Sequence, residues 1–161
     1  MEKFKFSEQS MQILLTTIKN NEGSLECQRK RGMFKNGFFT VYKDSLGFDT
    51  IGYGHLVRAG EKFANGINET DADALLRQDL DGAIADADAW IPLQAQPEIV
   101  QRVLVEMVFQ LGINKARKFV KFTSAIQARD YSRAGSELRN SSWYTQTPHR
   151  VEQHVKNLQM A

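Results

Sequence analysis

Two acidic residues of this sequence lie where a carboxyl group could take part in acid–base chemistry. Glu22 comes at the end of a predicted amphipathic helix, just before Gly23. A helix C-terminus disfavours negative charge, so it favours the protonated carboxyl that a general acid needs. Asp44 belongs to the stretch Tyr42–His55, which holds three glycines, two carboxylates, a threonine and a histidine. The residues alone favour an ordinary exposed glutamate at position 22, and they fit a hairpin with merely polar turn residues as well as a site at Asp44.

The stretch Tyr42–His55 is predicted to form a short β-hairpin, because aromatic and β-branched residues alternate with turn formers. Ser45-Leu46-Gly47 supplies the turn, and its glycine suits a positive φ. Phe48–Tyr53 then returns as the second strand. Gly52 and Gly54 expose the backbone where a ligand or another element can approach closely.

Apolar periodicity and capping residues predict the helices that must hold this hairpin. Ser7 caps a first helix that runs from Glu8 to about Asn20. Asn68 caps a long helix that ends near Trp90, and Glu98–Leu111 forms another strong helix. Shorter helices are predicted at residues 114–122, 124–128, 132–140 and from Pro148 to about Leu158.

Four blocks of sequence, in the same order, resemble the phage-type lysozymes, the glycoside hydrolase family typified by the lysozyme of T-even bacteriophages. The blocks are Ile18–Gly23, the Tyr-x-Asp and Thr-Ile-Gly-x-Gly-His pattern within Tyr42–His55, Met107–Gly112 and Trp143–Arg150. The resemblance implies a mostly α, α+β fold with two lobes. A small N-lobe (about 13–67) would carry the hairpin sheet, and a connecting helix (about 69–90) would lead to a helical C-lobe (about 91–161). The whole chain, 1–161, would then form one lysozyme-like domain, with the first helix packing on the C-lobe.

The same resemblance assigns the catalytic residues. Glu22 matches the acid glutamate, which protonates the leaving oxygen of a glycosidic bond. Asp44 matches the ionised carboxylate that stabilises positive charge and helps to activate water. Thr50 matches the hydroxyl that holds this water. Asp49 should point to the opposite face of its strand from Thr50, because side chains alternate along a strand.

Further positions are implied in the same way. Leu56, Phe109 and Gln110 would contact the glycan, and Ser124 and Glu137 lie near other subsite positions of the family. The remaining matches are supporting residues: His55 and Asp79 would form a structural pair, and Arg150 would approach the acid glutamate.

The chain departs from the family pattern on both sides of the hairpin. The insertion Ser24–Asn36 separates the Glu-Gly pair from the segment leading to Asp44. It makes Glu26 a rival for the acid, although Glu26 has no helix-end setting. The insertion also holds the basic run Cys27–Gly32, which forms either a solvated loop or a patch that meets wall polyanion or nucleic acid. After the hairpin, Leu56–Ile67 is too brief for the helix usually found there.

Composition limits the function classes. The 161 residues include 42% hydrophobic and 25% charged side chains with a formal charge of +2, as in a soluble globular protein that meets a polyanionic target. The lone cysteine, Cys27, excludes an intramolecular disulfide and favours synthesis in a reducing compartment. We expect no signal peptide, no membrane insertion, no nucleic-acid partner and a monomer. His55, His149 and His154 lack metal-ligand spacing, and no dinucleotide or serine-nucleophile motif is present, so we expect no metal and no cofactor.

The resemblance makes the leading hypothesis a peptidoglycan hydrolase, an inverting muramidase that cuts the β-1,4 bond between N-acetylmuramic acid and N-acetylglucosamine. It would be made in the bacterial host cytoplasm and act on the periplasmic wall after release, or travel in the virion. The alternative is a catalytically impaired wall-binding or virion structural module. A transglycosylase is a third possibility, which the retention of both Asp44 and Thr50 disfavours.

Overall fold

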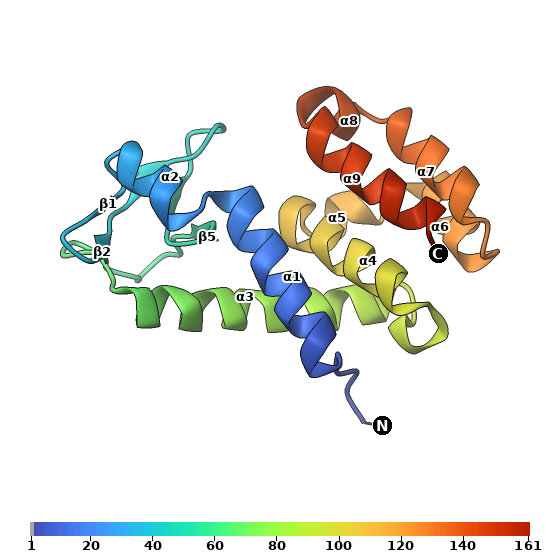
Figure 1. The fold of residues 1–161 in the computed structure, drawn as a ribbon, viewed down its shortest axis with the longest axis horizontal. Coiled ribbons are helices and arrows are strands. Elements are labelled where there is room, and N and C mark those ends of the chain that lie inside the picture. Colours follow the sequence, from blue (N-terminus) through green and yellow to red (C-terminus); the bar gives the residue numbers. More distant parts are fainter. Residues whose placement is uncertain (1) are drawn as a thin grey trace. The chain divides into compact units, whose positions relative to one another are not determined.

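A computed structural model describes residues 2–161 of the chain, which form a mostly helical α+β fold (Figure 1). The elements, in chain order, are α1 (Glu8–Glu22), α2 (Leu25–Lys30), β1 (Phe34–Lys35), β2 (Phe38–Phe39), β3 (Tyr42–Lys43), β4 (Asp49–Ile51), β5 (His55–Leu56), α3 (Glu69–Trp90), the 3-10 helix η1 (Leu93–Ala95), α4 (Glu98–Leu111), α5 (Ile113–Ala116), α6 (Val120–Gln127), α7 (Tyr131–Arg139), α8 (Ser142–Gln146) and α9 (Pro148–Gln159).

The contacts divide the chain into two units. The sheet unit comprises Gln12–Asp81, and the helical unit comprises the residues up to Met11 together with Gly82–Ala161. Both boundaries fall inside helices, so α1 and α3 each contribute to both units. Figure 1 shows α3 as one continuous helix.

The sheet unit contains two small antiparallel sheets. The strands β1 and β2 form one hairpin, and β3, β4 and β5 form a three-stranded sheet in chain order. The sequence predicted a second strand over Phe48–Tyr53, but β4 ends at Ile51 because residues 52–54 form a turn, and β5 then adds a third strand that was not predicted. The core of this unit is aromatic and aliphatic: the rings of Phe34 and Phe39 lie 4.7 Å apart, and those of Phe39 and Tyr53 lie 5.2 Å apart.

Side-chain caps explain where the helices α1 and α3 begin. The Ser7 hydroxyl accepts a hydrogen bond from the backbone N–H of Ser10 (3.1 Å), and the Asn68 side chain accepts one from Asp71 (2.8 Å). These bonds satisfy N–H groups that the first helical turn leaves without a partner. The predicted long helices near α1, α3, α4 and α9 are therefore confirmed, and α4 has the predicted bounds.

The helical unit buries an apolar face of each main helix. Fully buried side chains come from η1, α4, α6, α7 and α9, and include Leu93, Leu104, Met107, Phe122, Ile126, Leu138 and Val151. Within this unit, Arg102 of α4 donates a hydrogen bond to the buried Ser10 hydroxyl of α1 (2.6 Å). The predicted helix at residues 114–122 is wrong in detail, because α5 ends at Ala116 and α6 begins at Val120.

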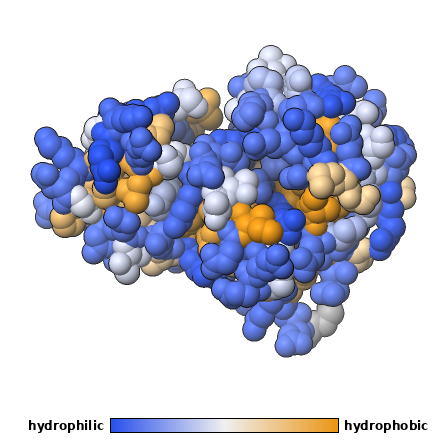
Figure 2. Space-filling model, in the orientation of Figure 1, coloured by the Kyte–Doolittle hydropathy of each residue, from blue (hydrophilic) through white to orange (hydrophobic). Residues whose placement is uncertain are grey.

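The face drawn in Figure 2 carries several small hydrophobic areas within a predominantly hydrophilic surface. Among the described residues, no helix combines the length and the apolar character that a bilayer crossing requires.

Candidate active site

One face of the three-stranded sheet carries Thr50 between Tyr42 and Leu56. Tyr42 on β3 and Leu56 on β5 are the two cross-strand partners of Thr50, and directly opposed residues point to the same face. Thr50 is 3% exposed, and its hydroxyl donates a hydrogen bond to the carbonyl of Phe48 (3.0 Å). Because the proton is used in this bond, the Thr50 oxygen still offers lone pairs to a hydrogen-bond donor.

Asp49 lies on the other face of β4, as its place in the sequence predicts. It pairs across the strands with Lys43, and a carboxylate oxygen lies 2.7 Å from the Lys43 ammonium. Both side chains are about half exposed or more. A surface ion pair of this kind contributes little to stability, so Asp49 is an ordinary surface residue of the sheet.

Asp44 is held by the turn that joins β3 to β4. Its Oδ1 accepts hydrogen bonds from the backbone N–H groups of Leu46 and Phe48, both at 2.9 Å. The Asp44 carbonyl accepts a third bond from Gly47 (3.0 Å), which has the positive φ of +85° that glycine tolerates best. The turn therefore fixes the carboxylate of Asp44 while leaving the residue partly open to solvent.

Glu22 is the last residue of α1, and its carboxylate lies against the turn at residues 52–54. A β-carbon built on Gly54 would lie 2.7 Å from a Glu22 carboxylate oxygen, closer than real β-carbons come to any neighbour. Only glycine at position 54 therefore permits this approach. The close backbone approach predicted for Gly54 is confirmed, and its neighbour is Glu22.

Tyr42 links the two acidic residues. Burial raises the pKa of the Tyr42 phenol, and the charges of Glu22 and Asp44 raise it further, while Arg31 opposes them. Both carboxylates are thus near enough to act on the same hydroxyl group. No role was predicted for Tyr42 from the sequence, although its position two residues before Asp44 in the Tyr-x-Asp pattern was a usable signal.

The insertion is an ordered part of this region. Ser24 caps the helix α2, and its hydroxyl accepts a hydrogen bond from the backbone N–H of Cys27 (3.3 Å). The part of the basic run up to Lys30 is therefore helical rather than a loop, and Arg31 and Gly32 form the turn that follows. Glu26 is exposed and forms an ion pair with Lys30 at 3.3 Å. Glu26 therefore has neither the burial nor the glycine contact that distinguishes Glu22.

Gln28 lies on the inner face of α2 and is 1% exposed. Its side-chain amide donates to the carbonyl of Gly23 (2.9 Å) and to the carbonyl of Gly52 (3.0 Å). One side chain of the insertion thus joins the end of α1 to the turn beside β4.

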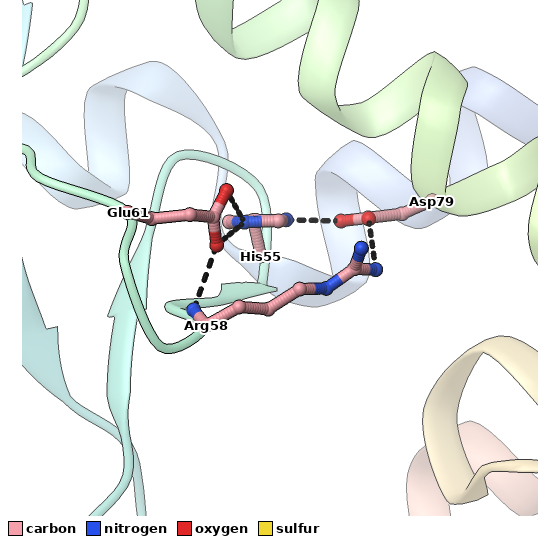
Figure 3. A network of polar contacts seen from close by, with 4 residues as sticks. All are labelled: His55, Arg58, Glu61 and Asp79. Atoms are coloured by element: carbon pink, nitrogen blue, oxygen red, sulfur yellow. Dashed lines mark hydrogen bonds and ion pairs between the residues drawn. The ribbon is translucent and has the colours of Figure 1, made fainter.

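The predicted pair of His55 and Asp79 is present, and it is part of a larger network (Figure 3). The Nδ1 atom of His55 lies 2.8 Å from an Asp79 oxygen, and its Nε2 lies 3.0 Å from an oxygen of Glu61. Arg58 contributes to both sides: its backbone N–H donates to Glu61 (2.7 Å), and its guanidinium lies 3.7 Å from Asp79. Glu61 was not predicted, because it lies in an irregular loop without a motif.

The backbone N–H of Arg58 and the ring of His55 hold the pKa of Glu61 below its ordinary value. Because both ring nitrogens of His55 face carboxylate oxygens, both hydrogen bonds form only when the two nitrogens carry protons. The network therefore joins β5, the following loop and α3 through the ring of His55.

The remaining predicted site residues lie in the helical unit. Phe109 and Gln110 are half-buried in the last turn of α4, and Arg150 is half-buried in the first turn of α9. A hollow of about 430 Å³ in this unit has Glu137 in its lining, with neighbours that include Lys118, Phe119, Lys121, Asn140 and Ser141. Ser124 is not among the lining residues. The predicted approach of Arg150 to Glu22 stays a prediction.

Within residues 2–161, the structure brings together no three His, Cys, Asp or Glu side chains that could hold a metal ion. The functional groups that it does assemble are carboxylates, a hydroxyl and a phenol around the small sheet.

Comparison with known proteins places this chain in a family. The family model described as phage lysozyme matches residues 35–157, a range that includes the hairpin and begins after Glu22 and α2. The chain is 27% identical over 135 residues to probable T4-type lysozyme 1 of Dictyostelium discoideum, covering 68% of this chain and 79% of the relative.

Two phage proteins are also similar, and both are much longer than this chain. Peptidoglycan hydrolase gp36 of Pseudomonas phage phiKMV is 31% identical over 123 residues, which is 73% of this chain and 13% of gp36. The pre-baseplate central spike protein Gp5 of Enterobacteria phage T4 is 28% identical over 135 residues, which is 69% of this chain and 24% of Gp5. The family match covers most of the chain, and this chain therefore belongs to the phage lysozyme family.

Proposed function

We propose that this protein is a peptidoglycan hydrolase that cleaves the β-1,4 bond between N-acetylmuramic acid and N-acetylglucosamine, with inversion at the anomeric carbon. One observation carries the proposal: the carboxylate of Glu22 is held against Gly54, beside the hairpin that fixes Asp44 and Thr50. Membership of the phage lysozyme family and similarity to a phage peptidoglycan hydrolase support the substrate class.

In this mechanism Glu22 protonates the leaving oxygen as the glycosidic bond breaks. An acid at the last residue of a helix has its protonated form favoured by the helix dipole. Asp44, oriented by two backbone N–H groups, stabilises the positive charge that develops on the sugar ring. The Thr50 oxygen accepts a hydrogen bond from the attacking water, and Asp44 helps to remove the proton of that water.

Substrate contacts would come from both apolar and polar surface, as is usual for polysaccharide sites. Leu56, which is 53% exposed beside Thr50, would pack against a sugar ring. Phe109 and Gln110 on α4 would contact the glycan, and the hollow that Glu137 lines would receive a further sugar. The protein would act on the bacterial wall, either after release from the host cytoplasm or as part of a virion.

Loss of turbidity of a cell-wall suspension tests the activity, and the variants test the residues. We expect Glu22→Gln to lower the rate by at least about a hundredfold, the contribution of a general acid, and Asp44→Asn to lower it strongly. Glu26→Gln is the matched control and should retain the wild-type rate. If Glu26→Gln abolishes cleavage and Glu22→Gln does not, the assignment of the acid is wrong.

The products identify the reaction. A muramidase releases fragments with reducing ends, whereas a transglycosylase releases anhydro-muramyl ends, and mass spectrometry distinguishes them. Wall binding without any fragments would instead support the impaired wall-binding or virion module. The large phage relatives, of which this chain covers 13% and 24%, are the observation that favours testing this second possibility.

A further inference from the structure

The insertion Ser24–Asn36 supplies one buried polar side chain to the region around Glu22. Gln28 is 1% exposed, although it lies in a helix whose other long polar side chains face solvent. Both hydrogens of its amide group are used, one on the Gly23 carbonyl and one on the Gly52 carbonyl. These two carbonyls belong to segments that are far apart in sequence.

The two acceptors flank the groups of the proposed site. Gly23 directly follows Glu22, and Gly52 begins the turn that contains Gly54, against which the Glu22 carboxylate lies. Gly52 is also two residues from Thr50 along the chain. A side chain that joins these carbonyls therefore limits how far the end of α1 can move from the turn.

The orphaned oxygen of Gln28 indicates which part of the side chain matters. Its Oε1 is buried and has no hydrogen-bond partner. A buried acceptor without a donor is unfavourable, whereas an apolar side chain of the same shape would avoid this cost. The two hydrogen bonds that the amide group donates therefore explain why a glutamine, and not an apolar residue, occupies this buried position.

We propose that Gln28 is a positioning residue for the reaction: through its bonds to Gly23 and Gly52 it holds the Glu22 carboxyl at the turn beside Asp44 and Thr50. The inference rests on the proposed function, because it assigns Glu22 as the acid. The reaction requires an accurately placed Glu22 carboxyl, because displacing a reacting group by about 1 Å lowers the rate on the order of a hundredfold.

The chain contains a matched control for this proposal. Gln101 in α4 is 7% exposed, and its amide group likewise donates to two backbone carbonyls, those of Leu93 (2.9 Å) and Gln96 (2.8 Å). Gln28→Met and Gln101→Met remove the same pair of donors and keep the length of the side chain. Only Gln28→Met removes a connection to Glu22.

The experiment measures cleavage of solubilised wall glycan by the full chain, at a temperature at which circular dichroism shows each variant to be folded. We expect Gln28→Met to lower kcat by about tenfold or more with KM nearly unchanged, because the buried side chain of Gln28 is not exposed for contact with a substrate. Gln101→Met should stay within about twofold of the wild type. A merely structural role of Gln28 would leave kcat of the folded Gln28→Met variant at the wild-type value, and this result would overturn the proposal.

A second measurement applies if Gln28→Met does not fold. In the wild-type protein, both side-chain amide hydrogens of Gln28 should be protected from exchange with solvent in NMR spectra, and their resonances should shift in Glu22→Gln. Rapid exchange would show that the bridge does not exist and would overturn the proposal. A wild-type protein that cleaves no wall glycan would instead overturn the proposed function and the inference together, whereas an active wild type with an unaffected Gln28→Met overturns the inference alone.

Discussion

His55 and His154 are both buried, with 3% and 2% of their surface exposed, but their surroundings are opposite. His55 in the sheet unit has carboxylate oxygens within 3.0 Å of both ring nitrogens. Both ring nitrogens of His154 in the helical unit are buried without a hydrogen-bond partner, and its ring lies 5.4 Å from that of Trp143.

The carboxyl groups beside the two histidines also differ, because their pKa values are shifted in opposite directions. Hydrogen bonds hold the pKa of Glu61 below its ordinary value beside His55. Burial raises the pKa of Glu106 to about 7, against the charges of Arg150 and Arg102, and Glu106 lies 3.7 Å from His154. Burial, together with the charge of Arg150, lowers the pKa of His154 to about 4. Between about pH 4 and pH 7 the His154–Glu106 pair is therefore uncharged. Two equally buried histidines thus differ in whether their ring nitrogens have hydrogen-bond partners.

The largest expected effect comes from removing the ring of His55, which lies between two carboxyl groups. His55→Leu keeps the bulk of the ring but leaves Asp79 and Glu61 without their shared donor. Breaking a buried ion pair in this way costs about 3 kcal/mol of unfolding free energy, which urea denaturation at pH 6 measures. The double variant His55→Leu/Asp79→Asn should recover part of this loss, and Asp79→Asn alone should leave wall cleavage at neutral pH largely intact. A loss below about 1 kcal/mol in His55→Leu would mean that the network contributes little.

The second prediction concerns how the free energy of unfolding depends on pH through Glu106 and His154. Between about pH 4.5 and pH 7 the folded protein keeps a proton on Glu106 that the unfolded chain releases, so this residue makes stability fall as pH rises. Between about pH 4 and pH 6.5 the unfolded chain binds a proton at His154 that the folded protein does not, so this residue makes stability rise. The two contributions nearly cancel in the wild type from pH 4.5 to pH 6.5.

Glu106→Gln should expose the contribution of His154. Its unfolding free energy should rise by about 3 kcal/mol between pH 4 and pH 6.5, where the wild type stays nearly level through most of the range. Urea denaturation at half-unit steps of pH measures both curves. Parallel curves for the two proteins would show that Glu106 titrates normally in the folded state.

A smaller change is expected from His154→Leu. Removing two buried nitrogens without hydrogen-bond partners should stabilise the protein by about 1–2 kcal/mol at pH 5. The stability of this variant should then fall from about pH 4.5 to pH 7, the opposite slope from Glu106→Gln, because Glu106 is now the titrating group. A destabilised variant would indicate that the packing of the imidazole against Trp143 outweighs its desolvation.

Sequence patterns predicted some of these features and not others. The bounds of α4 and the caps Ser7 and Asn68 were predictable, because apolar periodicity and capping are local properties of the chain. The helix α2 is too short and too basic to show a periodic apolar face, although Ser24 before Leu25 was a usable signal for a cap.

Side-chain partners that are distant in sequence were harder to predict. The resemblance to a family supplied His55 with Asp79, but it supplied neither Glu61 nor the bridge of Gln28 to Gly52, because both lie in segments that depart from the family pattern. The contact of Glu22 with Gly54 was foreseen only as a close approach of unspecified origin. These contacts depend on how α2 and the loop before α3 pack, which no local rule specifies.

Glu61→Gln is expected to give the smallest effect. It tests the contribution of Glu61 separately from that of Asp79, the other carboxylate that contacts the His55 ring. The amide oxygen can still accept the bond from Arg58, but the negative charge that faces the ring is lost. The depressed pKa of Glu61 contributes stability that is present above its unfolded value near 4.5 and is lost as pH falls through its folded value. We expect the free energy of unfolding to fall by under about 1 kcal/mol at pH 7, and thermal melts at the acid end of the pH range should show no difference from the wild type.

Glu152→Gln is the control, because the pKa of Glu152 is likewise lowered by its pair with Arg139, which faces solvent. The effect at Glu152 should vanish in high salt, whereas the effect at Glu61 should persist, since the His55 ring that it faces is shielded from solvent; equal salt sensitivity would show that Glu61 acts only as a surface charge.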